Sequence, residues 1–161
     1  DMSLAKELVD IASEAGADAV KFQSFNADSL TTKKAPKAEY QLKNTDNHES
    51  QYEMLKKLEL SREQHAELIE YCASKKITFL SSPFCIKGLR QLLDFGLSII
   101  KVPSGEITHL PMLIELGTTD KKIILSSGAS TLGEIEFALA CISYGVKFGL
   151  KKPVSKEEIY S

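Results

Sequence analysis

Short apolar runs alternate along this chain with longer segments in which apolar residues recur every three or four positions. The runs are nearly continuous, as in strands buried on both faces, and fall at residues 18–23, 77–81, 98–102 and 122–126. The periodic segments predict amphipathic helices at residues 2–15, 52–58, 61–74, 86–95, 109–116 and 131–143. This alternation predicts an α/β fold, in which helices cover a parallel sheet.

Local signals predict where several of these elements begin and end. Glycines follow four helical segments and are expected to end them, namely Gly16, Gly96, Gly117 and Gly145. Ser61 and Gln64 have the spacing of a capping box at a helix start, and His65 on that helix is expected to face solvent. Residues 24–49 are polar and predict a long loop whose lysines, including Lys37, form a solvated surface.

Polar side chains gather where the predicted strands end. The third strand leads into residues 101–106 (KVPSGE), and the first, second and fourth end in Lys-Phe-Gln, Ser-Ser and Ser-Ser. Functional groups at the carboxyl ends of several parallel strands are typical of a (β/α)8 TIM barrel. Such a barrel needs about 250 residues, so the four βα units predict about half of one at residues 1–145, without its first strand. Residues 146–161 do not match the strand expected after the last barrel helix and are assigned to a tail outside this domain, and the chain is expected to come from a longer protein.

Composition and charge narrow the class of protein. The chain has 161 residues, 43% of them hydrophobic, and a net charge of −2 without any block of like charge, which argues against nucleic-acid binding. It has no apolar run near the roughly 20 residues of a membrane-spanning helix, and no signal peptide is recognisable. Three widely spaced cysteines predict reduced thiols rather than a disulfide framework. We therefore expect a cytoplasmic protein that binds small molecules.

Five segments together resemble the sialic acid synthase (N-acetylneuraminate synthase) family in its bacterial form. They occur in the family's order and spacing, and they are residues 15–23 (AGADAVKFQ), 49–54 (ESQYEM), 79–84 (FLSSPF), 101–106 (KVPSGE) and 124–128 (ILSSG). The resemblance implies condensation of phosphoenolpyruvate (PEP) with N-acetylmannosamine, which gives N-acetylneuraminate and phosphate. It also implies a divalent metal, Mn or Mg, whose ligands lie outside this chain, and a homodimer of the full-length protein.

The same resemblance assigns roles to individual residues. Those implied to hold the phosphate and carboxylate of PEP are Lys21, Ser82, Lys101, Ser104 and Ser126, with Ser50 as a further candidate. Those implied to face the sugar are Gln23, Phe84 and Glu106, while Glu106 and Lys101 are the candidate catalytic residues. No histidine of this chain is assigned to the metal. Two lysines and several hydroxyls suit an anion with about three negative charges, because they offset charge and donate hydrogen bonds.

Several alternatives stay open. A legionaminic or pseudaminic acid synthase would have the same PEP motifs but would act on a deoxy diacetamido sugar. Synthases of the KDO-8-phosphate or DAHP type act on phosphorylated sugars and would call for more arginines than Arg62 and Arg90. The strand-end lysines would also suit imine chemistry or simple solvation, and the serines would suit turns or caps. The alternative without enzyme activity is an inactive barrel fragment.

Overall fold

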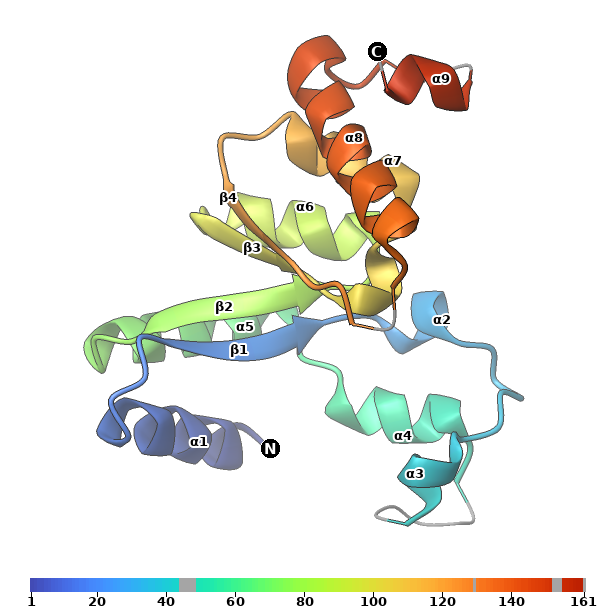
Figure 1. Ribbon diagram of the computed structural model, residues 1–161. Helices are drawn as coiled ribbons and strands as arrows, with labels where there is room; N and C mark the ends of the chain where they lie inside the picture. The colour runs from blue at the N-terminus through green and yellow to red at the C-terminus, as the bar shows by residue number, and fades with distance from the viewer. Residues whose placement is uncertain (44–48, 129, 152–154, 161) are drawn as a thin grey trace.

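Parallel strands form the centre of the molecule. The computed structural model describes residues 1–43, 49–128, 130–151 and 155–160. Its strands are β1 (Ala19–Ser24), β2 (Thr78–Pro83), β3 (Ile99–Val102) and β4 (Lys122–Leu125). β1 pairs in parallel with β2 and β3 with β4, while β2 lies beside β3 (Figure 1). The predicted parallel α/β arrangement is confirmed, but the described strands form no closed sheet, so only part of a barrel is present.

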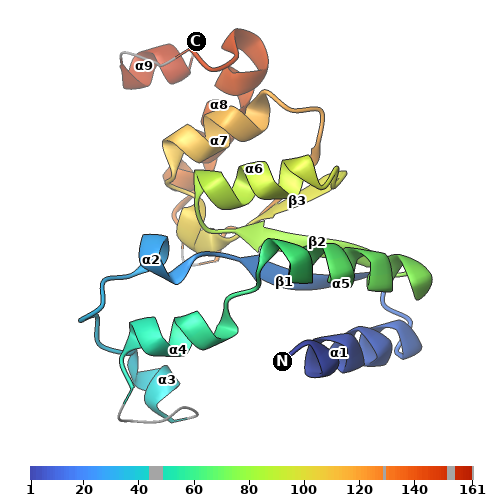
Figure 2. The same ribbon diagram turned by 180° about the vertical axis from the view of Figure 1, so that it is seen from behind.

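Long helices cover one face of these strands (Figures 1 and 2). They are α1 (Met2–Glu14), α5 (Arg62–Ser74), α6 (Ile86–Asp94), α7 (Leu110–Gly117) and α8 (Leu132–Phe148). One apolar core joins α1 and α5 to β1 and β2, and a larger core joins α6, α7 and α8 to β3 and β4. The capping box of Ser61 and Gln64 is present at the start of α5. Apolar periodicity therefore located these helices correctly.

The opposite side of the strands, which we call the helix-free face, carries Lys21, Gln23, Ser82, Lys101 and Ile124. Side chains alternate between the two faces of a strand. Since Ile100 and Val102 are fully buried in the helix-side core, Lys101 points to the other face. The register places Gln23 opposite Ser82, and Lys101 opposite Ile124. Polar groups from neighbouring strands therefore share this face.

The segment after β1 differs from the predicted loop. It contains two short helices, α2 (Ala27–Leu30) and α3 (Glu39–Leu42), before α4 (Gln51–Leu58). The expectation of solvated lysines was wrong for Lys37, whose side chain is 1% exposed because its Nζ pairs with Glu49 Oε1 at 3.0 Å. Part of the predicted loop, residues 44–48 with His48, lies outside the described residues. The described part of this segment is packed near the carboxyl ends of β1 and β2 (Figure 1).

Gly145 does not end its helix, contrary to the prediction. α8 continues through it to Phe148, because the glycine lets α8 lie directly against α7. A Cβ on Gly145 would lie 2.1 Å from Ile114 O, and one on Gly117 would lie 2.1 Å from Ile142 O. α7 ends at Gly117 as predicted, whereas α8 continues through Gly145, and close contact between the two helices accounts for the missing side chain at both positions.

Other boundaries and the end of the chain follow simpler rules. Gly16 and Gly96 have φ angles of +78° and +75° and directly follow the C-cap residues of α1 and α6, as predicted for helix-ending glycines. A short helix, α9 (Lys156–Ile159), packs Ile159 into the larger core. The division of the chain at residue 145 stays a prediction. No helix in the described ranges is long and apolar enough to span a membrane.

Candidate anion and sugar site

Lys101 lies at the centre of the polar groups on the helix-free face. Strand β3 carries it next to the buried Val102, and its Nζ donates to Val102 O at 2.7 Å. The same Nζ donates to Ser126 Oγ at 2.5 Å, just after β4. The ammonium group is thereby fixed between the ends of two neighbouring strands. It has no carboxylate partner within the described residues, so none of the acids described there offsets its charge.

A second lysine acts on the first. Burial lowers the pKa of Lys101 below its ordinary value of 10.5, and the positive charge of Lys21 lowers it further. Lys21 extends from β1 on the same face, is exposed, and likewise has no acidic partner among the described residues. Two uncompensated cations that repel each other favour an anion between them.

Three of the predicted serines lie at the strand ends, Ser82 at the end of β2 and Ser104 and Ser126 after β3 and β4. Ser82 is 2% exposed and lies opposite Gln23 in the β1–β2 register. Ser104 begins the short 3-10 helix η1 (Ser104–Glu106), and its Oγ lies 3.7 Å from where a Cβ on Gly128 would be. The loops after β3 and β4 are therefore in contact. Ser82, Ser104 and Ser126 all lie at strand ends on the side of the two lysines.

Ser50 is not brought into this group by any described contact. It caps α4, where its Oγ accepts from Glu53 N at 3.2 Å and donates to Glu53 Oε2 at 3.0 Å. Glu106 is half-buried and lies 2.7 Å from His109 through Oε2 and Nδ1. Its position after β3 fits a role beside Lys101, although its described bond is to His109.

Two of the three predicted sugar contacts, Gln23 and Phe84, are brought together, whereas the third, Glu106, is not among the residues that line their cavity. Both line a cavity of about 390 Å³ that opens at the carboxyl ends of β1 and β2, beneath the segment of α2, α3 and α4. Phe25 lines it as well, with its ring edge-to-face with Phe84 at a centroid distance of 6.3 Å. Because Gln23 lies two residues after Lys21 on one face of β1, the cavity and the lysines adjoin.

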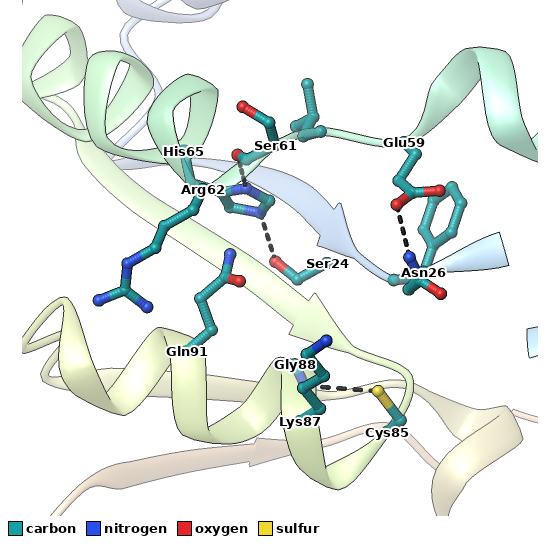
Figure 3. A pocket seen from close by; sticks show the side chains of 12 residues that line it. Ser24, Asn26, Glu59, Ser61, Arg62, His65, Cys85, Lys87, Gly88 and Gln91 are labelled. Carbon is teal, nitrogen blue, oxygen red and sulfur yellow. Dashed lines mark hydrogen bonds between the residues drawn. The ribbon is translucent and has the colours of Figure 1, made fainter. Parts of the chain in front are cut away.

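Sequence reasoning missed the buried histidine on the other side of the strands. His65 is 1% exposed rather than solvent-facing, because α5 turns it toward the ends of β1 and β2. Its Nδ1 lies 2.8 Å from Ser61 O and its Nε2 2.7 Å from Ser24 Oγ (Figure 3). Ser24 Oγ continues to Ser81 Oγ at 2.6 Å. Ser81 follows the apolar Leu80, but Ser24 follows Gln23, so no common sequence pattern marked this buried polar chain.

Figure 3 also shows a small cavity beside the hydrogen-bonded side chains of His65 and Ser24, with a volume of about 140 Å³. It lies between the first turns of α5 and α6 and is separate from the lysines. Arg62, at its rim, pairs with Asp94 at 3.4 Å, with both side chains more than half exposed. Cys85 caps α6, with its Sγ accepting from Gly88 N at 3.3 Å. These contacts hold the helices in place and involve no predicted site residue.

The described residues do not fit a bound metal. They include no group of three or more His, Cys, Asp or Glu side chains with the geometry to hold one. The three cysteines are free thiols, and burial raises the pKa of Cys72 and Cys141 to about 11. These two thiols are therefore inert at neutral pH.

Comparison with known proteins gives consistent results. The chain is 52% identical over 139 residues to N,N'-diacetyllegionaminic acid synthase of Campylobacter jejuni, covering 86% of this chain and 42% of that protein. It is 34% identical over 143 residues to pseudaminic acid synthase of Helicobacter pylori, covering 87% and 41%. The chain thus spans less than half the length of these relatives.

A solved structure shares the fold. It is the N-acetylneuraminic acid synthetase of Leptospira borgpetersenii in complex with citrate, which is 27% identical, with a TM-score of 0.73 over 91% of this chain and 46% of that one. The NeuB family model matches residues 8–156. From this match, which spans most of the chain, the chain belongs to the NeuB family, as the resemblance to sialic acid synthases predicted.

Proposed function

We propose that this chain provides the PEP-binding part of a synthase that joins PEP to a deoxy diacetamido sugar. The product is a nine-carbon 2-keto acid of the legionaminic or pseudaminic type. The observation that carries the proposal is the fixed ammonium of Lys101, which is bonded to Ser126 and repelled by Lys21. A bound anion would relieve that repulsion.

PEP suits these groups because it carries a phosphate and a carboxylate on three carbons. Lys21 and Lys101 would offset its charge, and the hydroxyls of Ser82, Ser104 and Ser126 would donate hydrogen bonds to its oxygens. With both anionic groups held, C3 of PEP would be directed toward the cavity that Gln23 and Phe84 line. The enol is thereby positioned against a sugar aldehyde in that cavity.

The reaction would proceed by carbon–carbon bond formation. C3 of PEP bonds to the aldehyde carbon of the sugar, water adds at C2, and phosphate leaves as the C2–O bond breaks. Glu106 is the candidate to orient a hydroxyl or move a proton. The divalent metal that the family resemblance implies has no ligand set among the described residues, and the proposed roles involve only side chains of this chain.

Similarity favours a diacetamido sugar over N-acetylmannosamine. The relatives at 52% and 46% identity are N,N'-diacetyllegionaminic acid synthases of Campylobacter jejuni and Legionella pneumophila. The human N-acetylneuraminate-9-phosphate synthase is 27% identical. The legionaminic type, which the sequence motifs left open as an alternative, is therefore the better-supported proposal.

The first prediction concerns PEP binding by the two lysines. We expect Lys101→Met and Lys21→Met each to weaken PEP binding about 10- to 100-fold, since a hydrogen bond to a charged group contributes about 1.5–3 kcal/mol. Isothermal titration calorimetry of the purified chain measures this. Lys122→Met is the matched control, because Lys122 is exposed at the opposite end of β4. Equal PEP affinity in all three variants would refute the anion site.

Phosphate release then distinguishes turnover from binding alone. PEP is incubated with the deoxy diacetamido sugar, with N-acetylmannosamine or without sugar, each in the presence of Mn²⁺. Release that depends on the diacetamido sugar supports the legionaminic-type synthase, whereas release only with N-acetylmannosamine supports the sialic acid type. PEP binding without release supports the alternative of a ligand-binding barrel fragment.

A further inference from the structure

The cavity beside the lysines has an uncharged lining. Every described side chain that lines it is neutral, in contrast to Lys21, two residues before Gln23 on β1, and Lys101 on β3. Its volume of about 390 Å³ falls within the range of about 300–1,000 Å³ usual for small-ligand sites. A phosphorylated sugar would lack a cation here, and burying its charge without one is costly. The cavity therefore suits a neutral ligand.

Apolar groups form a large part of the wall. The Phe25–Phe84 ring pair closes one side, and Leu30 and Leu55 come from α2 and α4. Tyr40, on α3, is 70% exposed although it lines the cavity, so its ring is available to a ligand. These surfaces favour methyl groups over hydroxyl groups, because a hydroxyl buried against them loses its hydrogen bonds to water.

An amide bridge fixes the polar part of the wall. Gln51 Oε1 accepts from Thr31 Oγ1 at 3.0 Å, while Gln51 Nε2 donates to Gln41 Oε1 at 3.5 Å. The Gln51 side chain thus joins the segment after α2 to α3 and α4, and its amide has a set orientation. The amide nitrogen carries two hydrogens, and the bond to Gln41 uses one of them. The second is a donor for a ligand carbonyl.

We propose that Tyr40, Gln51 and the Phe25–Phe84 pair determine sugar specificity by recognising an acetamido group together with a deoxygenated carbon. The acetamido carbonyl would accept from Gln51, and the acetyl or deoxy methyl would pack on the aromatic rings. This inference rests on the proposed function and deepens it. It assigns the choice of sugar to the segment from α2 to α4 rather than to the strand-end motifs.

The test measures binding of sugars and of PEP separately, on the purified chain. The sugars are a 2,4-diacetamido-2,4,6-trideoxy hexose and N-acetylmannosamine. Calorimetry measures the binding of each sugar with and without PEP. We expect the trideoxy sugar to bind about 10- to 200-fold more tightly, the range that a hydrophobic pocket achieves for small apolar differences. We expect Gln51→Leu to weaken its binding about tenfold and Tyr40→Ala about two- to tenfold.

Matched controls use residues outside the cavity. Gln91→Leu changes a half-buried glutamine that lines the separate cavity between α5 and α6, and Tyr160→Ala changes a tyrosine that is 55% exposed near the end of the chain. Both should bind the sugar as the unaltered chain does. PEP affinity should stay the same in all four variants, which shows that the strand ends are intact.

Two failures are distinguishable. If PEP binds but Gln51→Leu and Tyr40→Ala leave the preference for the trideoxy sugar unchanged, the specificity inference is wrong and the proposed function stands. If the unaltered chain does not bind PEP, the proposed function itself fails, and the inference fails with it. Preference for N-acetylmannosamine would also overturn the inference.

Discussion

His65 is a residue whose role depends on where its helix packs. In sequence it is one polar position on an amphipathic helix, but α5 places it in a buried chain with Ser24 and Ser81. Desolvation lowers its pKa below the ordinary value of 6.5, against a smaller opposing effect of its bond to the Ser61 backbone. The folded protein thus favours the neutral imidazole.

This gives a prediction about stability and pH. Below about pH 6.5 the unfolded chain binds a proton at His65 that the folded chain does not, so the free energy of unfolding falls as the pH drops. The contribution of His65 to the free energy of unfolding is fully present above its pKa in the unfolded chain. It is lost as the pH falls from that pKa to the lower pKa in the folded chain. Urea unfolding at about pH 7.5 and pH 5.5 measures it. His65→Gln should flatten the dependence, whereas His109→Gln should retain it; an unchanged slope in His65→Gln would contradict the prediction.

The residues of the proposed site were partly predictable at this scale. Lys21, Lys101 and the strand-end serines follow from one pattern, polar groups after apolar runs, because parallel strands bring their ends together. Gln51 and Tyr40 carry no such signal, since they come from short helices that pack beside the strands. Ser50 is engaged by its own helix in a capping box.

At the level of elements, the contact of α7 with α8 depends on two glycines. Gly117 and Gly145 face backbone carbonyls of the other helix so closely that no side chain fits. Glycine inside a helix ordinarily costs about 1 kcal/mol relative to alanine. Here it allows the close approach that places Tyr144 and Cys141 in the core.

We predict that Gly145→Ala and Gly117→Ala each destabilise the protein by about 1–3 kcal/mol, because the added methyl forces the helices apart. The control is Gly133→Ala, at the start of α8, where an added Cβ would meet nothing within 4 Å. It should leave stability unchanged or raise it by up to about 1 kcal/mol. Denaturant midpoints at constant slope provide the comparison. Equal midpoints for Gly145→Ala and Gly133→Ala would disprove the close contact.

At the level of the whole molecule, the described strands form two parallel pairs whose outer edges are open. β1 pairs only with β2 and β4 only with β3 among the described strands. Next to these edges, α1 exposes Leu4, Leu8 and Ile11 on one face, each more than half exposed. α8 exposes Leu132, Leu139 and Val146 at seven-residue spacing. Open strand edges flanked by apolar helix faces favour association with other chains.

We therefore predict that the 161-residue chain self-associates, and that charge on these faces reduces the association. Leu8→Glu and Leu139→Glu should shift the molar mass measured by light scattering toward that of the monomer. Leu58→Glu is the control, because Leu58 is 62% exposed on α4, away from both edges. A monomeric unaltered chain at micromolar concentration would rule the prediction out.

The sequence by itself determined the order of strands and helices and the parallel α/β class, and it predicted the lysines and serines of the proposed anion site. These follow from the period of apolar residues and from the residues after each strand, which are local signals. Only the tertiary structure decided that Gly145 continues a helix, that His65 and Lys37 are buried, and that Gln51 and Tyr40 line the cavity with Gln23 and Phe84. Each of these depends on contacts between segments far apart in sequence, which local periodicity does not encode.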